Sequence, residues 1–356
     1  MTIPAHPAAW LTGFIPDLPT PFDEAGAVDL KAFEQLCERQ IAAGVSALVV
    51  CDIAGEAPTL SPNEQENIVR TAVDVARGRV RVIAGAGSNA TSHAIELTRR
   101  AEAVGADAVL SVVPYYNKPM QAGIEAHFQA IAGSTRLPII LHDIPSRTVR
   151  DLADDTLARL AKSRQFAALR DSTGDVTRPE RLSTMLPSQF RIMSGHDATA
   201  LAFFAAGGDG CISMISNVTP DLCRAIFSSC RQGRLQAARY LQKRLEPLGA
   251  CLSQHNPAAL KYALSLLGLM DPTTRLPLVE LDGPAKAAVA RAITDIADED
   301  LLGAAEACNH NPLKLPATDK GLEGVTHERA GFRRGRQDAA RLAFGAAALC
   351  RDAGPR

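Results

Sequence analysis

The sequence predicts an α/β protein, a closed (β/α)8 TIM barrel with a C-terminal helical domain. Short apolar runs of strand length alternate with longer amphipathic stretches from about residue 14 to residue 231. The alternation repeats eight times, and a parallel sheet built from eight such units closes into a barrel. After residue 231 the strand pattern stops and only helical patterns follow. Periodicity alone also allows an open doubly wound sheet, but eight units favour closure.

Each element of the barrel has its own signal in the sequence. The expected strands are, in order, 14–18, 47–52, 80–84, 108–113, 138–143, 166–170, 190–194 and 211–214. Most are followed by a helical pattern, as at 30–43, 62–77, 90–104, 124–132 and 198–206. Ser61 to Glu64 supplies a cap residue, a proline at the first helical position and an acid in the first turn. Gly44 and Gly105 follow helical stretches, where glycine supplies the left-handed cap that ends a helix.

Four segments are expected along the chain. Residues 1–11 are an N-terminal extension, 12–232 the barrel, and 233–297 a helical domain with helices at 235–252, 257–267 and 283–297. Residues 298–356 form a basic tail. Its last part, Arg329 to Arg356, holds seven arginines against two aspartates. Such a charge run is typical of a solvated or disordered tail, and the other interpretations are an added interaction segment or a reading-frame error. The alanine-rich stretch 338–349 could form a helix.

Composition narrows the classes of function. The chain has 38 Lys plus Arg and 39 Asp plus Glu, a net charge of -1, so it has no positive electrostatic field that would attract nucleic acid. No apolar run is long enough for a membrane span, and residues 1–11 do not resemble a signal peptide. The eight cysteines are scattered without a C-x-x-C pair, as ordinary buried residues are. We therefore expect a cytoplasmic protein, and we expect no cofactor.

In a barrel of parallel strands, the active site forms at the carboxyl ends of the strands. The residues at those ends are Asp17, Asp52-Ile53, Gly85, Pro114-Tyr115-Tyr116, His142-Asp143, Arg170-Asp171, Gly195-His196 and Ile212-Ser213. So many ionisable groups at strand ends predict a polar pocket. Asp17, Asp52 and His196 are explained equally well as residues that cap helices or pair with one another.

Four segments carry a resemblance to a known family. They are Ala84 to Thr91, Val113 to Pro119, Ile144 to Thr148 and Ala167 to Gly174. In order and spacing, over residues 12–297, the chain resembles the dihydrodipicolinate synthase and N-acetylneuraminate lyase family of pyruvate-using class I aldolases, and most of all its dihydrodipicolinate synthase branch. The resemblance implies a lyase that joins or cleaves a 2-oxo acid, such as pyruvate, and an aldehyde. It also implies a homodimer or homotetramer.

The departures from this family lie where its reaction takes place. The resemblance places Arg170 where the family has its Schiff-base lysine, and His142 where it has a proton-relaying tyrosine. Arginine cannot form the Schiff base, because its guanidinium stays protonated. The family's threonine pair, which holds the pyruvate carboxylate, is Ile53-Ala54 here. The two lost hydroxyls each cost roughly 1 kcal/mol or more of hydrogen bonding. Arg170 could compensate as an anchor for an anion.

Other family positions are retained. By resemblance, Tyr116 reaches a neighbouring subunit's active site and belongs to its proton relay, although it could simply pack in an interface. Arg147 matches an arginine that binds a substrate carboxylate, which suits a planar guanidinium. Gly195 and Ile212 complete the expected substrate-binding set.

Three further possibilities concern another lysine, a metal ion and feedback by lysine. No other lysine takes over the Schiff base, because Lys118, Lys162 and Lys261 do not stand at strand ends. A metal on His142 and nearby aspartates would make lysine unnecessary, but no H-x-H or H-E-x-x-H spacing is present, so no metal is expected. Feedback by lysine is doubtful, since Asn89 and Tyr115 match the effector site but His93 replaces its acid.

Two hypotheses therefore remain open. In the first, the chain is an enzyme with altered chemistry, in which Tyr116 and His142 transfer protons and Arg170 and Arg147 hold an anionic substrate. At neutral pH, histidine is a better acid and base than tyrosine. In the second, it is a non-catalytic relative that binds a small oxo acid or pairs with an active homologue.

Overall fold

The computed structural model describes residues 8–309, with side chains for residues 8–297. Most of the expected basic tail, including 338–349, lies outside the described residues. Eight parallel strands, paired in the order β1-β8-β7-β6-β5-β4-β3-β2, confirm the predicted barrel. They are β1 (Gly13–Pro16), β2 (Ala47–Val50), β3 (Arg81–Gly85), β4 (Ala108–Val112), β5 (Ile139–Asp143), β6 (Phe166–Asp171), β7 (Arg191–Ser194) and β8 (Gly210–Ser213). A bridge between Asp17 and Val49 joins β1 to β2 and closes the ring.

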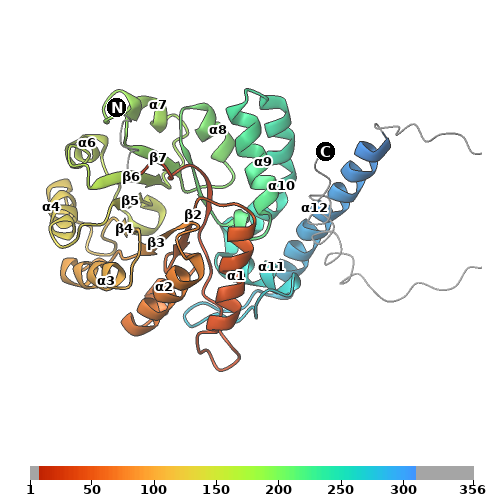
Figure 1. Cartoon of the computed structure of the whole chain (residues 1–356), viewed down its shortest axis with the longest axis horizontal. Helices are drawn as coiled ribbons and strands as arrows, with labels where there is room; N and C mark the ends of the chain where they lie inside the picture. Colours follow the sequence, from red (N-terminus) through yellow and green to blue (C-terminus); the bar gives the residue numbers. More distant parts are fainter. Residues whose placement is uncertain (1–7, 310–356) are drawn as a thin grey trace, which may run out of the picture. The chain divides into compact units, whose positions relative to one another are not determined.

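Helices follow the strands and lie on the outside of the barrel (Figure 1). They are α1 (Leu30–Ala42), α2 (Pro62–Ala76), α3 (Thr91–Ala103), α4 (Gln121–Ala132), α5 (Pro145–Thr148), α6 (Asp154–Leu160), α7 (Arg178–Ser183), α8 (Ala200–Ala205) and α9 (Pro220–Arg231). The predicted start of α2 is confirmed, because the side chains of Ser61 and Glu64 form a reciprocal capping box. Gly44 and Gly105 have φ of 79° and 93°, the left-handed conformation expected after α1 and α3.

An apolar plug fills the inside of the barrel. Every strand contributes to it, and eight of the contributors, one from each strand, are Ile15, Val49, Ile83, Leu110, Ile140, Ala168, Met193 and Ile212. All eight side chains are at most 1% exposed. Inward-pointing apolar residues of this kind are typical of (β/α)8 barrels, in which the interior is a packed core and not a pore. The plug supports the polar residues that lie above it at the strand ends.

The chain continues from the barrel into helices, as predicted. These are α10 (Leu235–His255), α11 (Ala258–Leu266) and α12 (Gly283–Asn309). One compact unit, which ends at Val289, includes α10 and α11 with the barrel. The boundary expected between residues 232 and 233 stays a prediction. In the part of the chain that is described, no helix has the length and apolarity needed to cross a membrane.

Candidate active site

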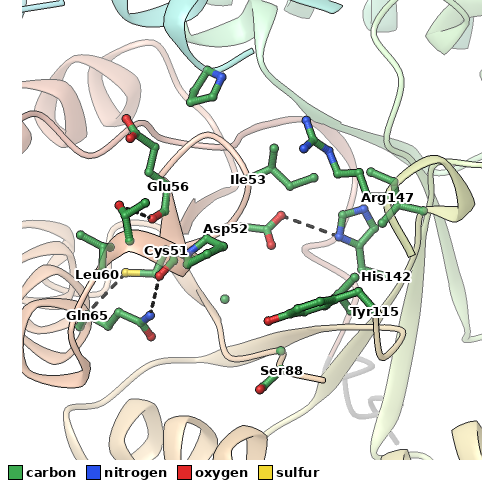
Figure 2. A pocket seen from close by; sticks show the side chains of 18 of the residues that line it. Cys51, Asp52, Ile53, Glu56, Leu60, Gln65, Ser88, Tyr115, His142 and Arg147 are labelled. Atoms are coloured by element: carbon green, nitrogen blue, oxygen red, sulfur yellow. Dashed lines mark hydrogen bonds and ion pairs between the residues drawn. The ribbon is translucent and has the colours of Figure 1, made fainter. Parts of the chain in front are cut away.

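A cavity of about 490 Å³ opens at the carboxyl ends of β2 to β5. Its wall includes Asp52, Ile53, Tyr115, His142 and Arg147. Figure 2 shows the carboxylate of Asp52 in the middle of this group, facing His142, with Arg147 beside them. The cavity therefore lies at the strand ends of the barrel, where the sequence predicts the active site.

The end of β2 is shaped so that Asp52 enters the cavity. Cys51 has φ of 56°, which turns the chain sharply after the strand. The turn brings the backbone of Cys51 against β3, where a Cβ on Gly85 would lie 2.0 Å from the Cys51 carbonyl oxygen. Only glycine fits there. The Asp52 side chain is left 14% exposed at the cavity wall.

Arg170 lies beneath the cavity and is not among the residues that line it. The side chain is 1% exposed, and one guanidinium nitrogen, Nη1, contacts both Asp17 Oδ2, at 3.1 Å, and Asp52 Oδ2. Burial lowers the pKa of Arg170, but the charges of Asp17 and Asp52 outweigh it and raise the net pKa, so the cation is permanent. Burial raises the pKa of Asp17 to about 7, even though the charge of Arg170 opposes the rise.

His142 stands over this ion cluster as a neutral imidazole. Its side chain is fully buried, and burial, together with the charges of Arg170 and Arg147, lowers its pKa well below the usual value. The ring Nε2 lies 3.2 Å from Ser172 Oγ. The ring Nδ1 lies 3.8 Å from Asp52 Oδ2, and because the imidazole is uncharged this is a polar contact and not an ion pair.

The acids that follow His142 and Arg170 in the sequence belong to a separate structural cluster. Arg178 Nη1 donates to Asp143 Oδ2 at 2.7 Å and to Asp171 Oδ2 at 3.2 Å. Its Nε donates to Asp154 at 2.9 Å. Burial raises the pKa of Asp143 to about 6, against the charge of Arg178. These acids are thus neutralised by one buried cation that joins β5, β6 and α7.

A second fully buried ion pair supports the opposite wall. Glu56 lines the cavity, and its Oε1 is paired with Lys261 of α11, both side chains being 0% exposed. Lys261 also lies 3.9 Å from the ring centroid of Phe22. Burial lowers the pKa of Lys261 to about 8, although the charge of Glu56 opposes the fall. Lys261 is committed to this pair, and no lysine is among the cavity-lining residues of the described chain.

The other predicted site residues are dispersed. Ala54 is buried behind the wall, and Ile212 belongs to the apolar plug. Gly195 lies where a Cβ would be 1.9 Å from Ser172 Oγ, so it lets the ends of β6 and β7 approach closely. Tyr116 is 89% exposed, with φ of 67°, and does not line the cavity. The binding and relay roles expected for these four residues stay predictions.

The positions discussed for lysine feedback lie close to the cavity. Tyr115 and His93 are part of its wall. Asn89 instead contacts Asn117, which donates to the Asn89 carbonyl oxygen at 2.9 Å. His93 is 3.6 Å from Glu96, on the same helix. Within the described residues, no group of three His, Cys, Asp or Glu side chains is arranged to hold a metal ion.

The structure adds Asp52 and Asp17 to the candidate site. In the sequence, each is an acid at the end of a strand, and a role in helix capping or ion pairing explains it as well as a functional role does. Pairing is what occurs, but with Arg170, from a strand 118 residues beyond Asp52. The only sequence signal is that acids and an arginine stand at the ends of strands that a barrel brings together.

Comparisons with known proteins agree with this architecture. The Dihydrodipicolinate synthetase family matches residues 10–296. The 4-hydroxy-tetrahydrodipicolinate synthase of Hyphomonas neptunium is 48% identical over 280 residues, which are 78% of this chain and 95% of the relative.

Solved structures give the same result. Dihydrodipicolinate synthase from Acinetobacter baumannii, in complex with pyruvate, is 38% identical to this chain, with a TM-score of 0.78, covering 80% of this chain and 98% of that one. The 4-hydroxy-tetrahydrodipicolinate synthase of Methylacidiphilum fumariolicum SolV has a TM-score of 0.80 at 37% identity, covering 83% and 99%. This chain belongs to the dihydrodipicolinate synthetase family.

Proposed function

We propose that this protein is a dihydrodipicolinate synthase-like lyase that acts on a 2-oxo acid such as pyruvate without forming a Schiff base. One observation carries the proposal. The cavity at the strand ends combines a cation, Arg147, with a carboxylate, Asp52, and a neutral imidazole, His142, but no described residue of its wall is a lysine. This set can bind an acid and move a proton, but it offers no amine to attack a carbonyl.

Arg147 is the group that suits the substrate carboxylate. It is exposed at the cavity wall, and its guanidinium makes no hydrogen bond or ion pair within the described residues. A guanidinium binds a carboxylate through two parallel hydrogen bonds. Arg170 is less suited to this task, because it lies below the wall and already contacts Asp17 and Asp52. Its role is better explained as holding Asp52 in place.

Asp52 and His142 are the groups suited to proton transfer. A carboxylate and an uncharged imidazole can both accept a proton, and they lie 3.8 Å apart at the cavity wall. Removing a methyl proton from pyruvate gives the enolate that adds to an aldehyde. Arg147 can stabilise the negative charge of that enolate, because a guanidinium is a cation that donates hydrogen bonds to an oxyanion.

Two measurements test this proposal. Pyruvate and borohydride should leave no covalent adduct on the wild-type protein in intact-mass spectrometry, whereas Arg170→Lys should gain one. In deuterium oxide, saturating pyruvate should exchange its methyl protons in the presence of the wild-type protein, as followed by proton NMR. Arg147→Met and Asp52→Asn should both abolish this exchange. The matched control is Arg159→Met, which removes a half-exposed ion pair with Glu125 on the outside of the barrel. A clear adduct on the wild-type protein would overturn the proposal.

A second candidate function is supported by the state of His142. Because its pKa lies well below the usual value, the imidazole is a weak base, and a non-catalytic family member would need no stronger one. Such a protein would bind a small oxo acid, or pair with an active homologue. Pyruvate binding without any methyl exchange would favour this candidate.

We also propose that the protein forms a homodimer or homotetramer and is located in the cytoplasm.

A further inference from the structure

Residues 271–278, which follow α11, form a strap that reaches the cavity. Pro277 and Leu278 line the cavity wall, whereas Leu276 is 80% exposed and does not line it. No residue of the strap belongs to a helix or a strand. A segment of this kind is expected to be mobile unless its side chains are anchored.

One side chain of the strap, Arg275, anchors it to the barrel. Its Nε and Nη2 donate to the Gly26 carbonyl oxygen at 2.9 and 2.7 Å, and its Nη1 donates to the Thr59 carbonyl oxygen at 3.0 Å. Nη1 and Nη2 also donate to the carboxylate of Glu64 at 3.1 and 2.6 Å. This hydrogen bonding lowers the pKa of Glu64 to about 2, so the pair stays ionised at neutral pH. The guanidinium thus joins the strap to the loops that follow β1 and β2 and to the first turn of α2.

A second anchor acts on the backbone of the strap. Arg275 N donates to Glu56 Oε2 at 3.0 Å. Lys261 is paired with Glu56 Oε1, and its Nζ donates to the Thr273 carbonyl oxygen at 2.9 Å. The strap is therefore fixed at Thr273 and Arg275, just before the two residues that line the cavity. The charge of Glu56 is balanced in the same contact.

The strap lies at the apolar end of the cavity. Figure 2 shows Glu56 and Leu60 on the side of the cavity opposite to Arg147 and His142. Arg275 N binds Glu56, so the strap belongs to the Glu56 side. Apart from Asn256, the strap, the start of α11 and the segment after Glu56 contribute mainly apolar residues to the wall, namely Ala57, Pro58, Leu60, Pro257, Pro277 and Leu278.

A ligand held by its carboxylate at Arg147 would extend toward this end. The cavity has a volume of about 490 Å³, more than a molecule as small as pyruvate fills. Each methylene group that enters an apolar site adds to the affinity, whereas a chain that presses against a fixed side chain loses affinity. An anchored apolar wall therefore favours longer ligands up to a limit and rejects those beyond it.

We propose that Leu278 is a specificity-determining residue that limits the chain length of the 2-oxo acids that the cavity accepts, and that Arg275 is the positioning residue that holds this wall in place. This rests on the proposed function, because it takes the ligand to be a 2-oxo acid bound at Arg147. Without the Arg275 anchor, the strap yields to a longer chain and the limit is lost.

A series of acids that differ only in chain length tests the limit. The affinities of pyruvate, 2-oxobutanoate, 2-oxopentanoate, 2-oxohexanoate and 2-oxooctanoate for the intact protein are measured by isothermal titration calorimetry. Each added methylene should tighten binding by up to roughly fourfold until the chain meets Leu278, and the affinity should fall for longer acids. An affinity that rises through the whole series, or does not change along it, would overturn the limit.

Two leucines of the strap form a matched pair of variants. Leu278→Ala removes an isopropyl group from the wall, so the tightest-binding acid should be longer by at least one methylene group. The affinity for pyruvate should change by less than about twofold, because pyruvate does not reach the strap. Leu276→Ala makes the same change on an exposed side chain and should leave the length profile as in wild type. A purely structural effect would weaken all acids alike.

Variants of Arg275 test the anchor. In Arg275→Met, the affinity of the longest acid relative to that of pyruvate should rise at least about tenfold. Backbone amides of residues 271–278 should exchange their hydrogens at least about tenfold faster, as measured by mass spectrometry, while the barrel strands exchange as in wild type. Arg275→Lys keeps a charge for Glu64 but loses the planar fork, so it should give smaller changes in the same direction. Thermal melting shows whether each variant is folded, and Arg275→Lys serves if Arg275→Met is not.

The outcomes separate this inference from the proposed function. If pyruvate binds without an adduct and Leu278→Ala leaves the length profile unchanged, the role of Leu278 is overturned and the proposed function stands. A shift in Leu276→Ala as large as that in Leu278→Ala would also overturn it. If the profile and the hydrogen exchange are unchanged in the Arg275 variants, the role of Arg275 is overturned. If no acid of the series binds to the wild-type protein, both the inference and the proposed function are overturned.

Discussion

Arg170→Met should strongly destabilise the fold, because it leaves two carboxylates without their shared cation. The guanidinium is 1% exposed and lies 3.1 Å from Asp17, which is 0% exposed. Two unit charges at that distance interact by about 5 kcal/mol at an effective dielectric constant of about 20. Removing one partner of a buried ion pair typically costs about 3–5 kcal/mol. We expect a loss in this range in the free energy of unfolding at pH 7.5.

The loss should depend on pH in a defined direction. In the wild-type protein, the charge of Arg170 opposes the burial that raises the pKa of Asp17 to about 7. Without Arg170 that pKa rises further, so the variant binds an additional proton at and above pH 7. The difference between wild type and variant should therefore widen as the pH rises above about 7. Below that pH, Asp17 is protonated in both proteins and the difference is smaller.

Urea unfolding followed by circular dichroism at pH 6 and pH 8.5 measures both effects. The double variant Asp52→Asn with Arg170→Met should lose less than the sum of the two single variants, since it removes a pair together, by a coupling of about 0.5–3 kcal/mol. Arg159→Met is the control, because half-exposed ion pairs contribute about 0–1 kcal/mol. A loss below about 1 kcal/mol for Arg170→Met, or strict additivity in the double variant, would refute this reasoning.

Three further predictions concern other residues. Asp17→Asn imitates the protonated acid. Because the pKa of Asp17 is raised, the wild-type protein loses stability as the pH rises from 3.8 to about 7, so the variant should gain stability relative to wild type over that range. A difference in the urea unfolding free energy that does not change with pH would contradict this prediction. Lys261→Met should lower the free energy of unfolding by about 3–5 kcal/mol, as measured by thermal or urea unfolding. Adding Glu56→Gln to this variant should recover part of the lost stability. No recovery would show that the pair is not coupled. Tyr116→Ala should change the unfolding free energy of a monomer by less than about 0.5 kcal/mol, because the side chain is 89% exposed. The same variant should form smaller oligomers in sedimentation experiments. Unchanged sedimentation would count against an interface role.

The fold could be predicted from the sequence because its signals are local and repeated. Strand length, helix periodicity, the Ser61 to Glu64 cap and the glycines after α1 and α3 each act over a few residues. Eight such units leave few ways to bury their apolar faces, so the barrel follows from the pattern. The strand-end rule also indicated His142 and Ile53, and the family resemblance indicated Arg147; all three line the cavity.

The tertiary structure decided which of the strand-end residues face the cavity and which lie beneath it. Arg170 and Asp171 are adjacent in the sequence, but in a strand they point to opposite sides, so one meets Asp17 and Asp52 while the other meets Arg178. No local pattern contains these partners, because residues 17, 52 and 170 come together only when the barrel closes. The sequence by itself determined the barrel and the chemical groups at its mouth. The long-range pairing of buried charges decided that Asp52, held by Arg170, lies at the cavity wall.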